Sequence, residues 1–415
     1  MNLFKAAPKL VRAGKPLVRI TEALGRAAVP IDASANALVI DARTATSFGD
    51  LSWLHSVATA HAQSAAFRKP GGRVVLLRRS PDHLDSAEAA AVSEAFVGFT
   101  KSLSQENGSR GATVNLLNDA SASQSDDACA APLDWLLSDD STYVTGQELT
   151  VVGAPPQEAD GDARSAVLVT GAARGIGLAT AEYVRKQQPN RPLVLVDHPS
   201  ASDSLHKAAS KLGDACVPLP LDVTAAFSGP AVGKELIGAG AALGGFGAVL
   251  HAAGITRDKT LARMSASEHW RPVIDVNLRA VAAIDEALLG TDGALAVGGC
   301  GFVVFGSTSG VAGNMGQANY AAAKSGLMGY AKARGAATRA DGHRFACVAP
   351  GFIITPMTQK VPFLKRYIAA RLNSLGQGGT PQMVAAAVHF LASPAAAGLA
   401  PGSLLRVCGQ FLGGR

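Results

Sequence analysis

A tyrosine and a lysine lie four residues apart in the stretch Tyr320-Ala321-Ala322-Ala323-Lys324. On a helix, side chains with this spacing share one face. An ammonium group beside a phenol favours the phenolate, so the pair predicts a tyrosine whose pKa falls from about 10 towards working pH and which acts as a general acid and base. The same spacing also fits two solvated helix residues, so neighbouring motifs must decide.

A hydroxyl group and an amide extend this chemistry. Residues 302–305 predict a buried strand that ends in Gly306-Ser307-Thr308-Ser309. Because α/β sheets bind ligands at the carboxyl ends of their strands, Ser307 is expected at the ligand-binding edge. Asn277 interrupts an apolar helical stretch. Either it caps or bends that helix, or its side chain and a freed backbone carbonyl hold a water molecule.

A glycine-rich stretch predicts a nucleotide site. The strand-like Ala166–Thr170 leads into Gly171-Ala172-Ala173-Arg174-Gly175-Ile176-Gly177 and then into a helix-forming run. This order places free backbone N–H groups and the positive helix end at one point, which suits a pyrophosphate; a tight turn without a ligand is the alternative. The next strand ends in Asp197, whose carboxylate suits an adenosine ribose and repels a 2′-phosphate. We therefore expect NAD(H), with NADP(H) as the alternative cofactor.

Two further strand ends belong to the same half of the chain. Residues 217–221 are followed by Asp222-Val223, a position that commonly borders an adenine ring. Residues 247–250 open into His251-Ala252-Ala253-Gly254. His251 is either a catalytic base or a structural histidine, and a single histidine at a strand end favours the structural role.

The elements that carry these motifs alternate along the chain. In the first half, strand patterns at 37–40, 73–77 and 113–117 alternate with helix patterns at 51–67 and 86–105. Alternating strands and helices predict parallel sheets with right-handed crossovers. Residues 154–165 contain two prolines, three acids and no large apolar residue, which is typical of a linker. The expected units are a basic arm at 1–30, which also fits an organelle presequence, an α/β domain at 31–153, the linker, and a second α/β domain at 166–415.

The first domain resembles the later half of the second. Gly98-Phe99-Thr100-Lys101 matches Gly329-Tyr330-Ala331-Lys332 at an offset of 231 (329 − 98), and Trp135-Leu136-Leu137-Ser138 matches Phe390-Leu391-Ala392-Ser393 at an offset of 255 (390 − 135). Because the second offset is larger, the first copy lacks a segment that the second carries. The smaller offset places Ala89 and Ser93 opposite Tyr320 and Lys324, so the first copy is expected to be a degenerate, non-catalytic domain.

Composition excludes several classes of protein. With 48% hydrophobic and 17% charged residues, the chain is an ordinary packed globule without an apolar run of about 18 residues for a membrane helix. Five widely spaced cysteines favour neither disulfides nor a metal site and suit a reducing, cytoplasmic compartment. The net charge of +6 lacks the aromatic-interleaved basic block of a nucleic-acid binder. The segment after Thr355, with Lys360, Lys365, Arg366 and Arg371, fits a substrate lid or a solvated helix.

Together, these residues resemble the short-chain dehydrogenase/reductase family over about 166–415. The matching positions are Thr170-Gly171, Gly175-Ile176-Gly177, Asp222, Ala252-Ala253-Gly254, Asn277, Ser307, Tyr320, Lys324 and Pro350-Gly351. Within the family, Gly254-Ile255-Thr256-Arg257-Asp258 and Gly316-Gln317-Ala318-Asn319-Tyr320 resemble the 3-oxoacyl-thioester reductases, and the additional front domain resembles their high-molecular-weight branch. His251 stands where an asparagine is usual.

The resemblance implies a doubly wound Rossmann domain behind a smaller flavodoxin-like or Rossmann-like one. It implies that Tyr320 protonates the substrate carbonyl, Ser307 holds its oxygen, Lys324 lowers the pKa of Tyr320 and binds the nicotinamide ribose, and Asn277 holds a water. The expected substrate is an acyl-CoA or acyl carrier protein thioester, and the alternative is another ketone or alcohol. A third possibility for the function is a non-enzymatic nucleotide-binding scaffold. The expected assembly is a homodimer or homotetramer. The cofactor contacts are expected at Gly171, Arg174, Gly175, Ile176, Gly177, Asp197, Asp222, Val223, Ala253, Gly254, Tyr320, Lys324, Pro350, Gly351, Ile353 and Thr355.

Overall fold

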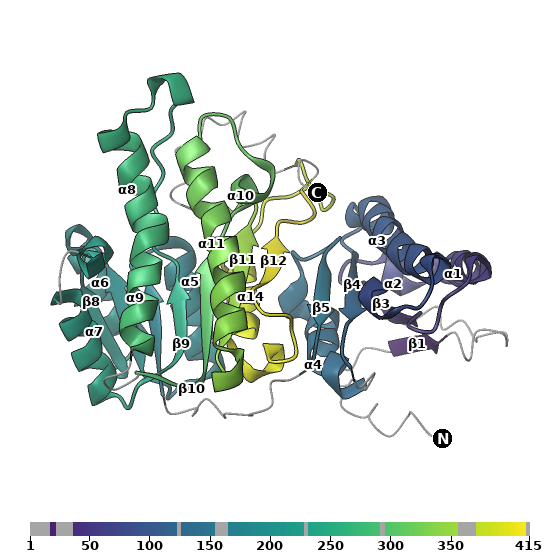
Figure 1. Cartoon of the computed structure of the whole chain (residues 1–415), viewed down its shortest axis with the longest axis horizontal. Coiled ribbons are helices and arrows are strands. Elements are labelled where there is room, and N and C mark those ends of the chain that lie inside the picture. Colours follow the sequence, from purple (N-terminus) through teal and green to yellow (C-terminus); the bar gives the residue numbers. More distant parts are fainter. Residues whose placement is uncertain are drawn as a thin grey trace.

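Two β-sheets, each made of parallel strands, lie side by side in this chain (Figure 1). The structure is a computed structural model that describes residues 17–21, 36–122, 126–153, 165–227, 231–290, 295–355 and 371–411, without the side chains of 17–21, 126, 226–227 and 231–233. The expected α/β class with parallel sheets is therefore confirmed. The expected linker, except for Ser165, and the cations at 360–366 lie outside the described residues.

The C-terminal sheet has seven strands in the order β12-β11-β10-β9-β6-β7-β8, and each neighbouring pair is parallel. The strand order reverses between β6 and β9, which is where doubly wound sheets open a crevice for a ligand. The strands are β6 (Ala166–Thr170), β7 (Leu193–Asp197), β8 (Cys216–Pro220), β9 (Phe246–His251), β10 (Ala296–Phe305), β11 (Arg344–Pro350) and β12 (Ser403–Val407).

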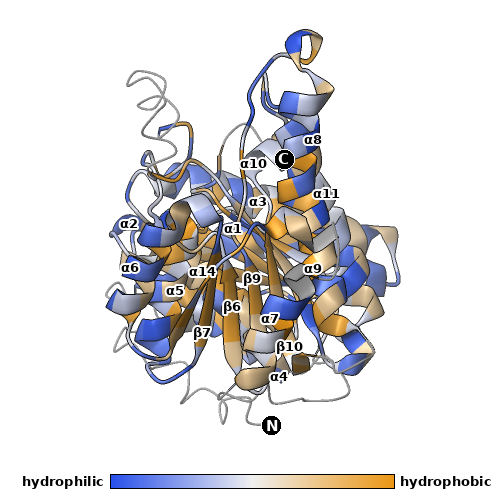
Figure 2. Cartoon of the chain, turned by 90° about the vertical axis from the view of Figure 1, so that its left-hand side faces the viewer, coloured by the Kyte–Doolittle hydropathy of each residue, from blue (hydrophilic) through white to orange (hydrophobic). Residues whose placement is uncertain are grey.

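Helices cover both faces of this sheet, so its central strands are apolar runs buried on both sides (Figure 2). One face carries α5 (Gly175–Gln187), α6 (Ser202–Leu212) and α14 (Pro381–Ala392). The other carries α7 (Ala231–Ala242), α8 (Arg271–Ile274), α9 (Ala280–Leu289) and α11 (Ala318–Ala337), and the short α10 (Thr308–Ala312) packs on α11. No helix in the described part of the chain is long and apolar enough to cross a membrane.

The N-terminal sheet has five parallel strands in sequential order. Its strands are β1 (Leu17–Thr21), β2 (Ala37–Asp41), β3 (Arg73–Arg79), β4 (Thr113–Asp119) and β5 (Glu148–Val151). Its helices are α1 (Phe48–His61), α2 (Ala65–Arg68) and α3 (Ala87–Gly108) on one face and α4 (Asp126–Leu137) on the other.

Single helical turns occur in both domains. They are η2 (Pro81–His83), η3 (Asp139–Ser141), η4 (Pro199–Ala201), η5 (Val223–Phe227), η6 (Leu261–Arg263), η7 (Ala266–Trp270), η8 (Asp275–Arg279), η9 (Arg339–Asp341) and η10 (Pro394–Ala396).

Two sequence-based expectations for this domain are wrong in detail. The expected helix at 51–67 is two helices, because Ser64 takes an extended conformation as the N-cap of α2. The expected basic arm contains β1, which pairs with β2 and extends the sheet. Short strands of mixed apolar and basic residues at a sheet edge carry only a weak pattern.

The element boundaries reproduce both offsets of the internal repeat. α3 begins at Ala87 and α11 at Ala318, while β4 begins at Thr113 and β11 at Arg344, and both pairs are separated by the smaller offset. The starts of α4 and α14, like those of β5 and β12, are separated by the larger offset. The repeat in the sequence is therefore a repeat of secondary structure.

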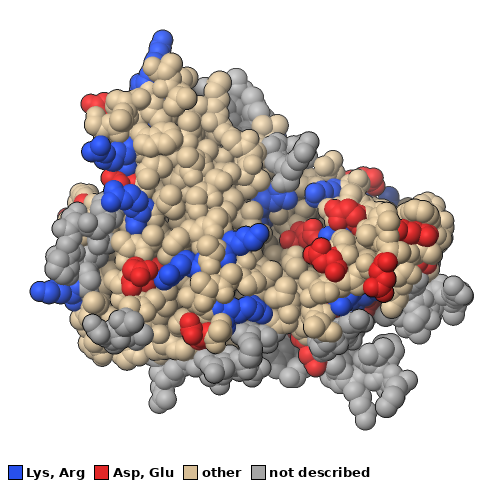
Figure 3. Space-filling view, in the orientation of Figure 1, with Lys and Arg blue, Asp and Glu red and all other residues tan. Residues whose placement is uncertain are grey.

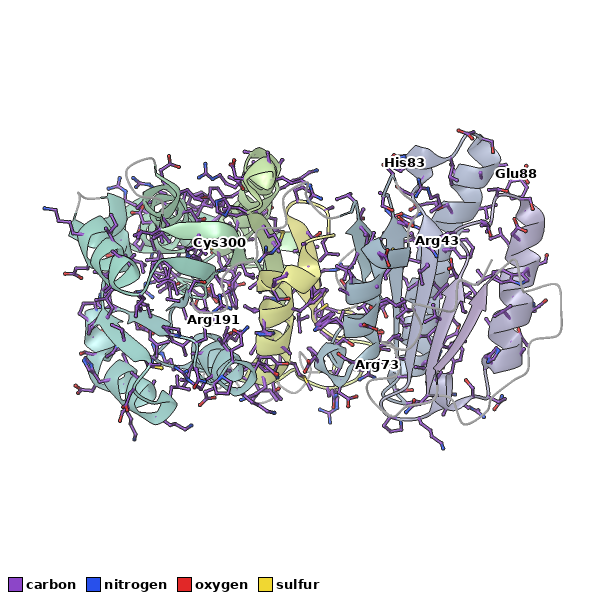
Figure 4. All side chains as sticks on the ribbon, turned by 90° about the horizontal axis from the view of Figure 1, so that it is seen from below. Arg43, Arg73, His83, Glu88, Arg191 and Cys300 are labelled. Carbon is purple, nitrogen blue, oxygen red and sulfur yellow. The ribbon has the colours of Figure 1, made fainter. Side chains whose placement is uncertain are left out.

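The two copies face each other across an approximate twofold axis. Trp135 on α4 and Phe390 on α14, equivalent at the larger offset, stack with ring centroids 4.5 Å apart and planes 8° apart. Tyr143 and Gly398 are equivalent at the same offset. The Tyr143 carbonyl accepts a hydrogen bond from the Gly409 N–H at 2.9 Å, and the Gly398 carbonyl accepts one from the Val152 N–H at 2.8 Å, so each bond joins the two domains. One hydrophobic cluster runs through both domains at this contact, and Figure 4 shows the domains side by side from below. The domains consequently form one packed body.

Candidate active site

The structure brings Ser307, Tyr320 and Lys324 together above the end of β10. Ser307 is the N-cap of α10, and its Oγ accepts a hydrogen bond from the Ser309 N–H at 3.1 Å. Lys324 Nζ donates to the Phe305 carbonyl oxygen at 2.7 Å and lies 5.5 Å from the centroid of the Tyr320 ring. The four-residue spacing on α11 thus places phenol and ammonium on one face, as the sequence predicts.

Burial governs the acid-base properties of this group. Lys324 is only 4% exposed, and burial lowers its pKa to about 8. Burial also raises the pKa of Tyr320. A hydrogen bond with Ser307 lowers this pKa, and the Asp258 carboxylate raises it. Desolvation therefore opposes the expected lowering of the Tyr320 pKa by Lys324. Tyr320 is therefore a protonated phenol at neutral pH, which suits proton donation.

Asn277 joins the group through the loop that follows β9. It is fully buried in the π-helical turn η8, where its Nδ2 donates to the Ile255 carbonyl at 2.9 Å and its Oδ1 accepts from the Ile255 N–H at 2.8 Å. A Cβ on Gly254 would lie 3.1 Å from Asn277 Oδ1 and 3.5 Å from Lys324 Nζ. Asn277 therefore fixes the loop and lies beside the lysine; a π turn of this kind often marks a functional site.

The glycine-rich turn after β6 has the shape of a pyrophosphate cradle. Gly171 and Gly175 have φ angles of +68° and +62°, which favour glycine. A Cβ on Gly177 would lie 2.1 Å from the Gly171 carbonyl oxygen, so no larger residue fits there. α5 begins at Gly175, with Arg174 exposed as its N-cap. The free N–H groups of this first turn suit an anion.

The predicted adenosine-side residues follow neighbouring strands. Asp197 ends β7, and its carboxylate accepts hydrogen bonds from the N–H groups of Ala173 at 2.9 Å and His198 at 2.8 Å. Asp222 follows β8 and accepts from the N–H and hydroxyl of Thr224. Both carboxylates therefore stand at the edge that carries the glycine turn.

The predicted nicotinamide-side residues follow β11. The Thr308 hydroxyl lies 3.5 Å from the Pro350 carbonyl, and the Gly351 N–H donates to Val407 at 3.0 Å. Ile353 is 3% exposed. A dinucleotide that extends from Asp197 past Gly171 to this segment would meet Ser307 and Tyr320 at its reactive end, and so the described residues fit the expected cofactor. No cluster of three metal-binding side chains occurs among them.

Two residues that shape this site occur in the motifs quoted above, but sequence reasoning assigned them no role. Asp258 approaches Tyr320 and accepts a hydrogen bond from Gln317 Nε2 at 3.0 Å. Asn319 is fully buried; its Nδ2 donates to the carbonyls of Arg257 and His269, and its Oδ1 accepts from the Tyr320 N–H at 2.8 Å. These side chains tie the loop after β9 to the start of α11. A polar run directly before a predicted helix is the signal that indicates such anchors.

His251 is a structural residue, as the sequence favours. It is 1% exposed, its Nε2 lies 2.7 Å from Asp285 Oδ1, and the Tyr330 hydroxyl donates to Asp285 Oδ2 at 3.0 Å. This buried group connects β9, α9 and α11 beneath the candidate site.

In the first copy, charged side chains fill the corresponding edge of the sheet. The strand registers align Leu77 with Phe305, so Arg79 takes the place of Ser307. Ser93, the counterpart of Lys324, donates to the Arg79 carbonyl at 2.5 Å. Arg43, labelled in Figure 4, bridges Asp41 and Asp119 at 2.7 and 3.3 Å. This edge therefore holds paired charges where the second copy holds its reactive groups.

Comparison with known proteins assigns the family. The family profile described as "Enoyl-(Acyl carrier protein) reductase" matches residues 171–409, more than half of the chain. The chain belongs to the short-chain dehydrogenase/reductase family. As a member of this family it is an NAD(P)-dependent oxidoreductase.

Curated relatives of this dehydrogenase/reductase carry the name 3-oxoacyl-[acyl-carrier-protein] reductase FabG. The protein from Vibrio cholerae is 36% identical over 230 residues, which are 55% of this chain and 90% of the relative. The Thermotoga maritima protein is 36% identical over 232 residues, 54% of this chain and 89% of the relative. The Escherichia coli protein is 35% identical over 230 residues, 55% of this chain and 90% of the relative.

Proposed function

We propose that this enzyme reduces a 3-oxoacyl thioester to the 3-hydroxyacyl thioester. The arrangement of Ser307, Tyr320 and Lys324 beside the nucleotide cradle is the observation that carries the proposal. The relatives named 3-oxoacyl-[acyl-carrier-protein] reductase support the substrate class.

Each residue has a role in this reaction. The Ser307 hydroxyl holds the substrate carbonyl oxygen, and Tyr320 donates its phenolic proton to that oxygen. Lys324 stabilises the negative charge that develops on Tyr320 and binds the nicotinamide ribose. Asn277 holds the water through which Tyr320 is reprotonated. The bound nicotinamide supplies the hydride.

The substrate class is tested by following the absorbance of NADH. We expect oxidation of NADH with acetoacetyl-CoA or acetoacetyl-acyl carrier protein, because both present phosphopantetheine, and little with a cyclic ketone of similar size. Turnover with the cyclic ketone alone would contradict the thioester assignment but not the hydride chemistry. Absence of turnover with every carbonyl, despite cofactor binding, would favour a non-enzymatic scaffold.

We infer that the enzyme prefers NADH. Asp197 is held at the end of β7 by two backbone N–H groups, which supports a role for its carboxylate in binding an adenosine ribose. A 2′-phosphate there would meet a like charge. We expect Asp197→Ser to raise kcat/KM with NADPH and lower it with NADH, changing their ratio by about 10-fold or more. Asp203→Ser, which removes an exposed acid from α6, controls for net charge. A wild-type enzyme that prefers NADPH would contradict the inference.

We also propose a cytoplasmic homodimer or homotetramer. The five cysteines are free thiols, which fits a reducing compartment. Lys and Arg side chains border a broad uncharged area over the upper part of α11 in Figure 3, and such an area suits a second copy. Light scattering coupled to size exclusion will give the mass; a monomer would contradict this proposal.

A further inference from the structure

The non-catalytic domain contacts the segment that precedes α14. Residues 371–379 return towards the sheet and lie between the loop after β11 and the N-terminal domain. We propose that Tyr143 of the N-terminal domain is a positioning residue for nicotinamide binding, acting through residues 373–379 on the loop at 351–355. The inference rests on the proposed assignment of that loop to the nicotinamide.

Tyr143 is anchored to this segment by its hydroxyl group. The residue is 1% exposed, and its hydroxyl donates to the Gln377 carbonyl oxygen at 2.8 Å. Asn373 Nδ2 donates to the same carbonyl at 2.8 Å and lies 3.4 Å from the Tyr143 hydroxyl oxygen. Burial raises the pKa of Tyr143, so the phenol remains a donor throughout the working pH range. One side chain of the first domain thus fixes the turn that ends at Gly379.

Gly379 transmits this contact to the candidate site. A Cβ on Gly379 would lie 2.5 Å from the Tyr143 ring and 2.6 Å from Ile353 Cδ1, so the glycine backbone alone separates the two side chains. The Gly379 N–H donates to the Phe352 carbonyl at 3.0 Å, and its own carbonyl accepts from the Ile354 N–H at 2.9 Å. The Gly379 backbone therefore lies between the Tyr143 ring and the loop at 351–355 and is in contact with both.

Helix α3 supplies a second anchor to the same segment. Gln410 Nε2 donates to the Lys101 carbonyl at 2.9 Å, and its Oε1 accepts from the hydroxyls of Ser374, at 2.6 Å, and Ser104. Gln410 has a φ angle of +56°, which non-glycine residues adopt only when their surroundings hold them. α3 is the counterpart of the catalytic helix α11, so this copy of the helix supports the site of the other copy.

The expected effect follows from a population shift. If only the supported loop binds the nicotinamide, the apparent Kd rises as the supported fraction falls. Removing the hydroxyl of Tyr143 leaves Asn373 and the ring in place, whereas removing the ring also frees Gly379. Removing the hydroxyl should therefore raise the apparent Kd less than removing the ring.

Fluorescence titration of the full-length protein with NADH and with NADPH tests the proposal. Losing one buried hydrogen bond should raise the Kd by about fivefold in Tyr143→Phe, and Tyr143→Leu should raise it further. KM for the cofactor should rise likewise, with kcat at saturation nearly unchanged. Trp135→Leu is the matched control, because Trp135 also joins the domains but stacks on Phe390 on α14, away from the loop at 351–355.

Two outcomes would overturn the proposal. One is a wild-type Kd in both Tyr143 variants while they keep the wild-type circular dichroism spectrum. The other is an equal rise in Kd in Trp135→Leu, which would indicate general loosening of the domains. The Kd titration and the circular dichroism spectrum need no acyl substrate, so an error in the proposed thioester would leave both of these outcomes interpretable.

Discussion

Replacing Tyr320 with phenylalanine is expected to lower kcat for carbonyl reduction by about 10²- to 10⁴-fold. The phenol is half-buried, hydrogen-bonded to Ser307 and held protonated by desolvation, so it is the proton donor nearest to a carbonyl bound at Ser307. Phenylalanine keeps the ring and its packing. The Kd for NADH, measured by fluorescence, should therefore stay close to that of the wild type while steady-state turnover falls by this factor.

Tyr330→Phe is the matched control on the same helix. Tyr330 donates to the fully buried Asp285, so its loss should lower the free energy of unfolding by about 1–3 kcal/mol and leave kcat nearly unchanged. Substantial turnover in Tyr320→Phe would refute the proton-donor role. An equal loss of turnover in Tyr330→Phe would indicate that α11 tolerates no such change.

The second large effect is expected at Lys324. Its pKa of about 8 means that the ammonium is protonated below that pH and is lost as the pH rises. For reduction, kcat/KM should therefore be constant below about pH 8 and fall above it. Lys324→Met should lower kcat/KM by about 10²-fold or more and should remove this limb of the pH profile, because no group of that pKa remains.

Lys332→Met serves as the comparison, since Lys332 is exposed on the same helix. It should keep both the activity and the fall above pH 8. A wild-type profile that stays level through pH 9 would contradict the assignment of this limb to Lys324. Retention of the limb in Lys324→Met would assign it to another group.

The sequence predicts the layered fold well because buried parallel strands are short apolar runs bounded by glycine and polar residues. The strands at β2, β3, β4, β6 and β9 lie within one or two residues of their expected positions. The repeat offsets are equally readable, since they depend on spacing alone. The break between α1 and α2 and the edge strand β1 were not predictable, because local propensity there is weak and the contacts of the sheet decide.

The sequence by itself determined the types of the reactive residues, their spacing on α11, the glycine turn and the order of the strands that carry them. Each of these is local, since helix periodicity and backbone sterics act over a few residues. Only the tertiary structure decided how protonation works here, because desolvation depends on every neighbour that excludes water; it raises the pKa of Tyr320 where spacing alone predicts a fall. It also decided that Asp258 and Tyr143, far from α11 in the sequence, lie against the elements of the candidate site.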